Sequence, residues 1–197
     1  MKVLIACEFS GIVREAFSKR GHNAWSCDLL DTEIKGQHIK GDCRDILNDG
    51  WDLMIAHPPC TFLCNSGVRW LYTGGRGNVR DETRWIKMSE ACEFFKLLLA
   101  APIERIAVEN PIMHKHAMHL IKQNCNQTIQ PWMFGTAETK ATCFWLKGLL
   151  PLKPTKMVSK FINPRVHLAS PSLDRWKERS RTLPNIADAM AEQWGIA

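Results

Sequence analysis

Short apolar runs alternate along the chain with segments whose apolar residues are three or four positions apart. Residues 1–7 form such a run, and residues 12–20 follow with helical spacing that ends at Gly21. Further runs predict strands at 23–30, 38–46, 51–56, 105–110, 126–132 and 142–147, and helical spacing predicts helices at 84–100, 114–122 and 184–194. This alternation of strands and helices predicts an α/β fold with a doubly wound, mostly parallel sheet.

Candidate polar residues follow the predicted strands one after another. They are, in chain order, Glu8–Gly11, Asp28, Asp42, Cys60 and Glu109. Ligands of open α/β sheets bind outside the carboxyl ends of the strands, so these residues are expected to gather at one edge.

The length and composition fit one globular domain over residues 1–197. The chain is 45% hydrophobic and 23% charged, and its apolar stretches are shorter than the roughly 20 residues of a membrane helix. Its eight cysteines are scattered and no signal pattern opens the chain, so we expect free thiols in a reducing cytoplasm, without membrane contact. Residues 150–182, rich in Pro, Ser and basic side chains, predict irregular surface structure.

The net charge of +6 suits either a polyanion or a single nucleotide. Basic and aromatic residues interleave between positions 69 and 80, namely Arg69, Trp70, Tyr72, Arg76 and Arg80. Such residues grip a phosphate backbone or stack on a base. An ordinary surface loop is the alternative interpretation of the same residues.

The turn after the first strand, Phe9-Ser10-Gly11, allows a ligand to approach the backbone but lacks the G-x-G-x-x-G fingerprint of dinucleotide sites. Asp28 follows about 20 residues later, where an acid accepts hydrogen bonds from ribose hydroxyls. Together with Asp42, these residues suit a cofactor that contains adenosine.

Cys60 follows two prolines that hold the chain out of regular structure. A buried, inert cysteine is one interpretation, because free cysteines are usually buried. The other is a nucleophile, since Glu109 is expected on the neighbouring strand. A thiolate beside a carboxyl group fits attack on an electron-poor ring whose nitrogen is protonated, as methylation of cytosine at carbon 5 requires.

These motifs occur in the order that characterises a known family. Phe9-Ser10-Gly11 matches its F-x-G turn, Pro59-Cys60 followed by Ser66-Gly67 matches its nucleophile loop, and Glu109-Asn110 matches its Glu-Asn-Val. Over residues 1–148, with a weaker match in the final helix, the chain resembles the cytosine-C5 DNA methyltransferases, which use S-adenosylmethionine. The resemblance therefore implies a Rossmann-like methyltransferase fold.

The resemblance also implies roles for individual residues. The residues implied in catalysis are Cys60, Glu109, Asn110 and Lys140. Those implied in cofactor binding are Phe9, Ser10, Gly11, Asp28, Asp42 and Pro58, and those implied in substrate binding are Pro59, Ser66, Gly67 and Thr142. The basic residues of the 69–80 segment, Arg69, Arg76 and Arg80, are expected to bind substrate phosphate as well. Cys60 would add to carbon 6, Glu109 would stabilise the protonated ring nitrogen, and Asn110 would hold its loop. Lys140 is expected to lower the pKa of Cys60.

The chain departs from the family at three places. The Gln-x-Arg-x-Arg motif aligns with residues 138–142, where only Lys140 is positive and Thr142 replaces the second arginine. Val13 stands where a second glycine is usual. Residues 150–182 are too few for the family's target-recognition domain, so the chain resembles short phage and prophage forms.

Other functions remain open from the sequence. The same chemistry on a free deoxycytidine nucleotide needs no base flipping, whereas DNA would require a short target, a partner subunit or a homo-oligomer. A catalytically decayed nucleic-acid-binding or accessory subunit would explain the altered arginine motif, and an oxidoreductase is disfavoured by the missing glycine fingerprint. His114, His116 and His119 have no acid or cysteine at zinc-site spacing, so we expect no metal there.

Overall fold

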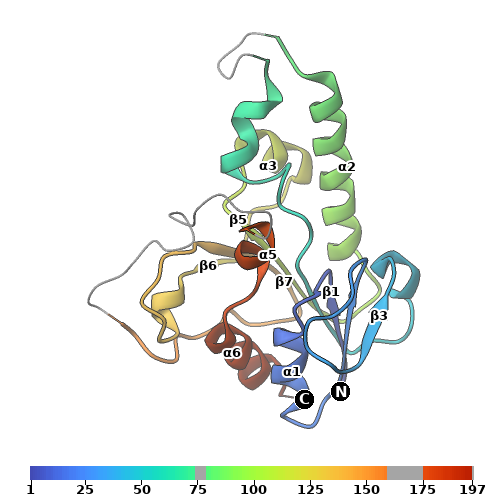
Figure 1. The fold of residues 1–197 in the computed structure, drawn as a ribbon, viewed down its shortest axis with the longest axis vertical. Helices are drawn as coiled ribbons and strands as arrows, with labels where there is room; N and C mark the ends of the chain where they lie inside the picture. Colours follow the sequence, from blue (N-terminus) through green and yellow to red (C-terminus); the bar gives the residue numbers. More distant parts are fainter. Residues whose placement is uncertain (74–78, 159–174, 197) are drawn as a thin grey trace.

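The computed structural model describes residues 1–73, 79–158 and 175–196 of the chain. The described part contains one seven-stranded sheet in the order β3-β2-β1-β4-β5-β7-β6 (Figure 1). The strands are β1 (Lys2–Ala6), β2 (Asn23–Asp28), β3 (His38–Lys40), β4 (Leu53–Ala56), β5 (Arg105–Pro111), β6 (Gln127–Ile129) and β7 (Thr142–Lys147). The first five are parallel, and β7 runs antiparallel to both β5 and β6.

This topology confirms the predicted α/β class with a doubly wound, mostly parallel sheet. It differs from the 3-2-1-4-5-6 order of dinucleotide-binding sheets by the antiparallel strand inserted between β5 and β6. The strand order reverses between β1 and β4, as in Rossmann-like sheets.

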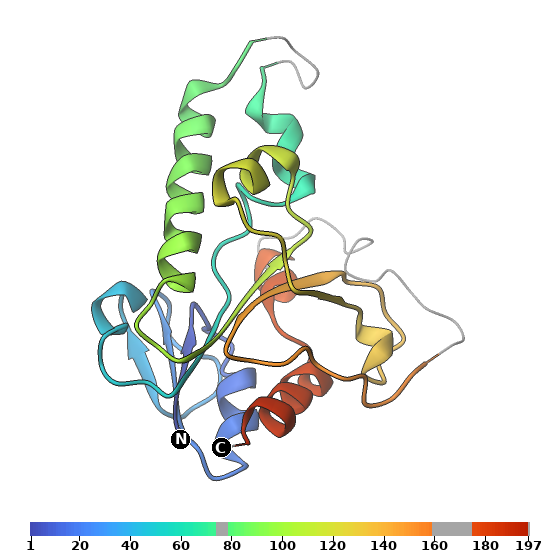
Figure 2. The same ribbon diagram turned by 180° about the vertical axis from the view of Figure 1, so that it is seen from behind.

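Helices cover both faces of the sheet (Figures 1 and 2). The helices are α1 (Ile12–Ser18), α2 (Glu82–Leu99), α3 (Lys115–Ile121), α5 (Arg175–Ser180) and α6 (Pro184–Trp194), with 3₁₀ helices η1 (Cys43–Ile46), η2 (Asn65–Leu71) and η3 (Pro131–Met133). Alternate residues of β1 pack into two different hydrophobic cores. Val3 and Ile5 pack with α1 and α6, whereas Leu4 and Ala6 belong to the core that includes Phe95 of α2.

The first half of α2, together with η2 and α3, projects beyond the sheet on the side where β4 and β5 end (Figures 1 and 2). Aromatic rings hold this projection together: Trp85 lies 6.1 Å from Tyr72 and 5.0 Å from His116, centroid to centroid. The projection therefore brings residues of η2, α2 and α3 beside the loops that follow β4 and β5.

Most predicted strands agree with the structure to within two residues at each end, but two are much shorter because local side chains end them. The strand predicted over 38–46 stops at Lys40, and the Asp42 side chain accepts a hydrogen bond from the backbone N–H of Arg44 and caps η1. The strand predicted over 126–132 stops at Ile129, since Pro131 opens η3 and has no N–H to donate.

The prediction of irregular structure over 150–182 is wrong in part, because α5 lies within it. Residues 159–174 of that segment are outside the described residues. All eight cysteines are free thiols, as expected. In the ranges that the structure describes, no helix is long and apolar enough to cross a membrane.

Candidate active site

A pocket opens where β1, β4 and β5 end. Its walls come from the turn after β1, the loop after β4, the end of β5, the segment before β7, and the end of α5 with the segment that follows it. The lining residues are Cys7, Glu8, Phe9, Ser10, His57, Pro58, Pro59, Cys60, Glu109, Pro111, Lys140, Arg179, Ser180, Arg181 and Thr182. The structure thus brings together the predicted nucleophile, the predicted carboxyl group and part of the predicted cofactor turn.

Three further predicted residues border this pocket or lie outside it. Thr142 lines a smaller neighbouring pocket with Glu109 and Lys140. Asp28 ends β2 beside Lys40, and Asp42 follows β3, so both lie at the predicted edge of the sheet without lining the pocket. Burial raises the pKa of Asp28, whereas hydrogen bonds from Arg44 lower that of Asp42.

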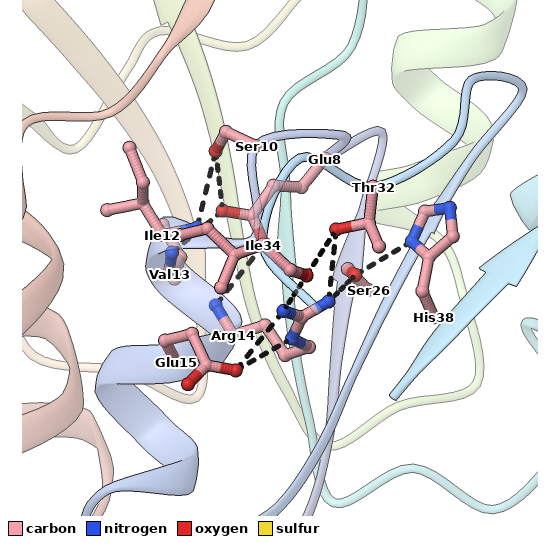
Figure 3. Close-up of polar contacts among 10 residues, drawn as sticks. All are labelled: Glu8, Ser10, Ile12, Val13, Arg14, Glu15, Ser26, Thr32, Ile34 and His38. Carbon is pink, nitrogen blue, oxygen red and sulfur yellow. Dashed lines mark hydrogen bonds and ion pairs between the residues drawn. The ribbon is translucent and has the colours of Figure 1, made fainter. Parts of the chain in front are cut away.

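The turn after β1 is closed by a carboxylate (Figure 3). Glu8 is buried, and its Oε1 accepts hydrogen bonds from the Ser10 hydroxyl at 3.1 Å and the Val13 N–H at 2.7 Å, while Oε2 accepts from the Arg14 N–H at 3.2 Å. Glu8 therefore occupies the amino end of α1. Gly11 precedes the helix with φ of 73°, a backbone conformation that favours glycine.

Arg14 fixes the loop between β2 and β3 (Figure 3). Its side chain is fully buried and donates to the Ser26 hydroxyl at 3.1 Å, the Thr32 hydroxyl at 3.2 Å and the Ile34 carbonyl at 2.6 Å. The carboxylate of Glu15, 3.1 Å away, balances its charge. Arg14 thus ties α1, β2 and the following loop into one unit behind the turn after β1.

The loop after β4 is held in a tight turn. The backbone N–H groups of Leu63 and Cys64 both donate to the Cys60 carbonyl at 3.0 Å. A Cβ on Gly67 would lie 2.5 Å from the Thr61 carbonyl oxygen, so this position requires glycine. Ser66 contacts the Cys64 thiol at 3.0 Å. The Ser66-Gly67 pair therefore shapes the loop that carries Cys60.

The segment after β5 anchors the same loop. The backbone N–H of Asn65 donates to the Ile112 carbonyl at 3.1 Å, and that of His114 donates to the Leu63 carbonyl at 2.9 Å. His114 also caps α3 and contacts the Phe62 carbonyl through Nε2 at 2.9 Å. His114 is thus a structural residue, and the described residues hold no group of three or more candidate metal ligands.

Cys60 and Cys64 form a coupled thiol pair. A hydrogen bond from one to the other, burial, and the charges of Cys64 and Glu109 raise the pKa of Cys60. The same hydrogen bond, with others from Ser66 and Gly67, lowers the pKa of Cys64 to about 5. This differs from the expectation that Lys140 would lower the pKa of Cys60, and Cys64 is more than a packed side chain.

Replacing Cys64 by alanine is therefore expected to make Cys60 more reactive. The substitution removes both contributions of Cys64, which raise the pKa of Cys60, so a larger fraction of Cys60 is thiolate at pH 8. Peptide-level mass spectrometry would measure the rate of Cys60 alkylation by iodoacetamide in both proteins. Cys92→Ala, which changes a buried thiol on α2, is the matched control. An unchanged or slower rate in Cys64→Ala would contradict the coupling.

Glu109 is held from two sides. Its Oε2 lies 3.0 Å from Nδ1 of His57, and the charge of Lys140 acts on it as well. Burial raises the pKa of Glu109, but His57 and Lys140 outweigh burial and hold it below its ordinary value. Asn110 is fully buried and its Nδ2 lies 3.5 Å from the Pro58 carbonyl, so it links β5 to the loop that carries Cys60.

Sequence reasoning missed two parts of the site. His57 stands directly before Pro-Pro-Cys, and that position was the signal that could have found it. The segment around α5 was the other: the Trp176 ring lies 5.9 Å from the Phe9 ring, Arg181 pairs with Glu33 at 2.7 Å, and Lys140 Nζ donates to the Arg181 carbonyl at 3.0 Å. The first contact joins α5 to the turn after β1, and the contacts of Arg181 join the segment after α5 to the loop between β2 and β3 and to the segment before β7.

The predicted substrate arginines lie on the projection. Arg69 and Arg80 are exposed, and their guanidinium groups stack 4.4 Å above Trp70 and 4.3 Å above Trp85. Trp70 is itself 51% exposed. Arg76, predicted in the same role, lies outside the described residues.

No family model matches the sequence, and no curated protein is similar to it. Among solved structures, the chain is similar to a prophage-encoded protein of E. coli described as a DNA modification methyltransferase, with a TM-score of 0.49 and 15% identity. The alignment covers 79% of this chain and 51% of the other, so this chain spans about half the length of that protein. Conclusions about function therefore rest on the geometry of the site and on the sequence motifs.

Proposed function

We propose that the protein is an S-adenosylmethionine-dependent methyltransferase that modifies carbon 5 of cytosine, in DNA. The observation that carries the proposal is that Cys60 and Glu109, from two neighbouring strand ends, line one pocket with the turn formed by Phe9 and Ser10. A thiol and a carboxyl group that face one pocket are what attack on carbon 6 of a pyrimidine requires.

The turn after β1 fits this cofactor better than a dinucleotide. The pyrophosphate of a dinucleotide binds at the amino end of the first helix, where this chain places the carboxylate of Glu8. A second negative charge there would be repelled, whereas a cofactor without phosphate meets no such conflict. The residues proposed to hold it are Phe9, Ser10, Gly11, Asp28, Asp42 and Pro58, and when bound it supplies an electrophilic methyl group.

The chain's own residues would act in sequence on the base. Cys60 Sγ loses its proton to the Cys64 thiolate and bonds to carbon 6. The ring nitrogen takes up a proton from water, and the electron pair of the C5–C6 double bond makes carbon 5 nucleophilic. The ionised carboxylate of Glu109 stabilises the protonated ring nitrogen. After carbon 5 gains the methyl group, carbon 5 and the ring nitrogen each lose a proton to water. The C5–C6 double bond re-forms as the Cys60–C6 bond breaks, which restores the Cys60 thiolate. Asn110 holds the nucleophile loop against β5 during these steps.

Exposed basic and aromatic side chains support DNA as the substrate. Arg69, Arg80 and Trp70 lie on η2 and beside α2, and the whole chain has a net charge of +6. A free deoxycytidine nucleotide is the second candidate, because Arg179 lines the pocket and would reach a phosphate bound there. Pro59, Ser66, Gly67 and Thr142 are proposed to shape the substrate side in either case.

A labelled-methyl transfer assay with duplex DNA, single-stranded DNA, dCMP and dCTP tests the proposal. We expect label in DNA, recovered as 5-methylcytosine after digestion, and a steep fall with added salt because phosphate contacts release counterions. Label in the nucleotides alone would reject DNA while keeping the chemistry. Label on another atom of the base would reject carbon 5, and no transfer to any substrate would reject the methyltransferase.

A further inference from the structure

His57 occupies a fixed and largely buried position in the pocket wall. Its side chain is 8% exposed, and its backbone N–H donates to the Ala6 carbonyl at 2.9 Å, which pins the residue against the end of β1. Its Nδ1 lies 3.0 Å from Oε2 of Glu109. The prolines at 58 and 59 follow directly and limit the freedom of its backbone. The ring is therefore placed by the fold.

The two carboxyl oxygens of Glu109 have different surroundings. One oxygen, Oε2, is taken by His57, and the Glu109 side chain is 16% exposed in the pocket. Since Oε2 is taken, Oε1 is the oxygen left for a ligand. Nε2 of His57 is buried and has no hydrogen-bond partner among residues 1–73, 79–158 and 175–196. A buried polar atom without a partner in a pocket wall is a site where a ligand or an ordered water completes the hydrogen bonding.

We propose that His57 is the positioning residue of Glu109: its Nδ1–H fixes the orientation of the carboxylate and maintains its negative charge, so that Oε1 faces the target base. The inference rests on the proposed function, in which the carboxylate of Glu109 stabilises a protonated ring nitrogen. It assigns a role to a residue that precedes the Pro-Pro-Cys motif and that the family resemblance does not include.

The electrostatics of the pocket agree with this role. Burial alone would raise the pKa of Glu109, and the hydrogen bond and charge of His57 are the largest influences that lower it, followed by the charge of Lys140. The other titratable or charged groups that line the pocket are Cys7, Glu8, Cys60, Lys140, Arg179 and Arg181, and Cys143 lies on the adjacent β7. Of these, only Glu8 is a carboxyl group, and its oxygens are engaged at α1.

Removal of His57 is therefore expected to shift the pKa of Glu109 in a defined direction. His57→Ala loses the hydrogen bond and the charge that lower the pKa of Glu109, while burial still raises it, so this pKa rises. Because the proposed function needs the ionised carboxylate, activity is lost as the pH falls through that pKa, and this loss moves to higher pH in His57→Ala. His57→Asn keeps an N–H donor near the Nδ1 position but carries no charge, so its acidic limb should lie between those of wild type and His57→Ala.

Two measurements test the inference on the full chain. Carbon-13 NMR of glutamate carboxyl groups, with Glu109→Gln identifying the resonance, would follow the ionisation of Glu109 in wild type and both variants. Methyl transfer to DNA as a function of pH would follow activity. We expect kcat of His57→Ala to fall about tenfold or more near neutral pH, with partial recovery in His57→Asn. Thermal unfolding would verify that both variants are folded.

The inference fails if the pKa of Glu109 is the same in wild type and His57→Ala, or if it rises without moving the acidic limb of the rate. If His57→Ala does not fold, His57→Asn takes its place, and the same comparison of the Glu109 pKa and the pH–rate profile with wild type decides whether the inference holds. The titration needs no substrate and no cofactor. Failure of the proposed function, seen as no methyl transfer by wild type, is therefore distinct from failure of this inference.

Discussion

Replacement of Cys60 by serine is expected to reduce methyl transfer by about a thousandfold or more. A hydroxyl is a far weaker nucleophile than a thiolate and stays protonated in the pocket, and loss of a nucleophile typically removes several orders of magnitude in rate. The rate of label transfer in a single turnover, with protein in excess over DNA, would measure the effect without interference from product release.

The matched control is Cys125→Ser. Cys125 is a partly exposed thiol that contacts Thr128 at 3.8 Å and does not line the pocket. We expect its single-turnover rate to equal that of wild type and both variants to have the thermal stability of wild type. A Cys60→Ser protein that retains more than a tenth of the wild-type rate would rule out Cys60 as the nucleophile.

Replacement of Arg14 by alanine is expected to lower the free energy of unfolding by about 3–5 kcal/mol, as removal of one member of a buried charged network does. The substitution removes the guanidinium hydrogen bonds to the Ile34 carbonyl and to the Ser26 and Thr32 hydroxyls, and it opens a cavity behind the turn after β1. Urea unfolding followed by tryptophan fluorescence would measure the loss. Binding of S-adenosylmethionine, measured by calorimetry, should be lost as well.

Arg20→Ala is the control for this effect. Arg20 pairs with Asp188 at 3.6 Å, and their side chains are 35% and 57% exposed. Exposed ion pairs contribute at most about 1 kcal/mol, so this variant should remain close to wild type in both measurements. Equal losses of stability in the two variants would show that the network around Arg14 has no special part in fixing the loop.

The periodicity of the sequence is sufficient to predict the strands of the sheet and most of the helices. Apolar runs identified β1, β2, β4, β5 and β7, and helix α6 has the predicted bounds of 184–194. The direction of β7 was beyond sequence reasoning, because antiparallel pairing depends on how the chain returns across the sheet. Helix α5 was missed for a similar reason: its six residues are too few for a clear period, and Trp176 contacts the distant Phe9.

Part of the candidate site was predictable because parallel strands end at one edge. From the sequence alone, that rule predicts that Cys60 and Glu109 lie near each other. It gave no information on the coupling of Cys60 to Cys64, since the order in which two thiols ionise depends on distances and burial. Arg14 likewise resembles any polar helix residue in the sequence, and only the folded loop shows that it is buried.

The most direct test of the central claim is covalent trapping on DNA that contains 5-fluorocytosine. Fluorine at carbon 5 cannot leave as a proton does, so the bond between Sγ of the nucleophile and carbon 6 persists after methyl transfer. Incubation of this DNA with the protein and S-adenosylmethionine, followed by digestion and mass spectrometry, would identify the modified peptide. We expect a methylated adduct on Cys60 in wild type and none in Cys60→Ser. The absence of any adduct from an actively methylating protein, or an adduct on Cys64, would contradict the mechanism.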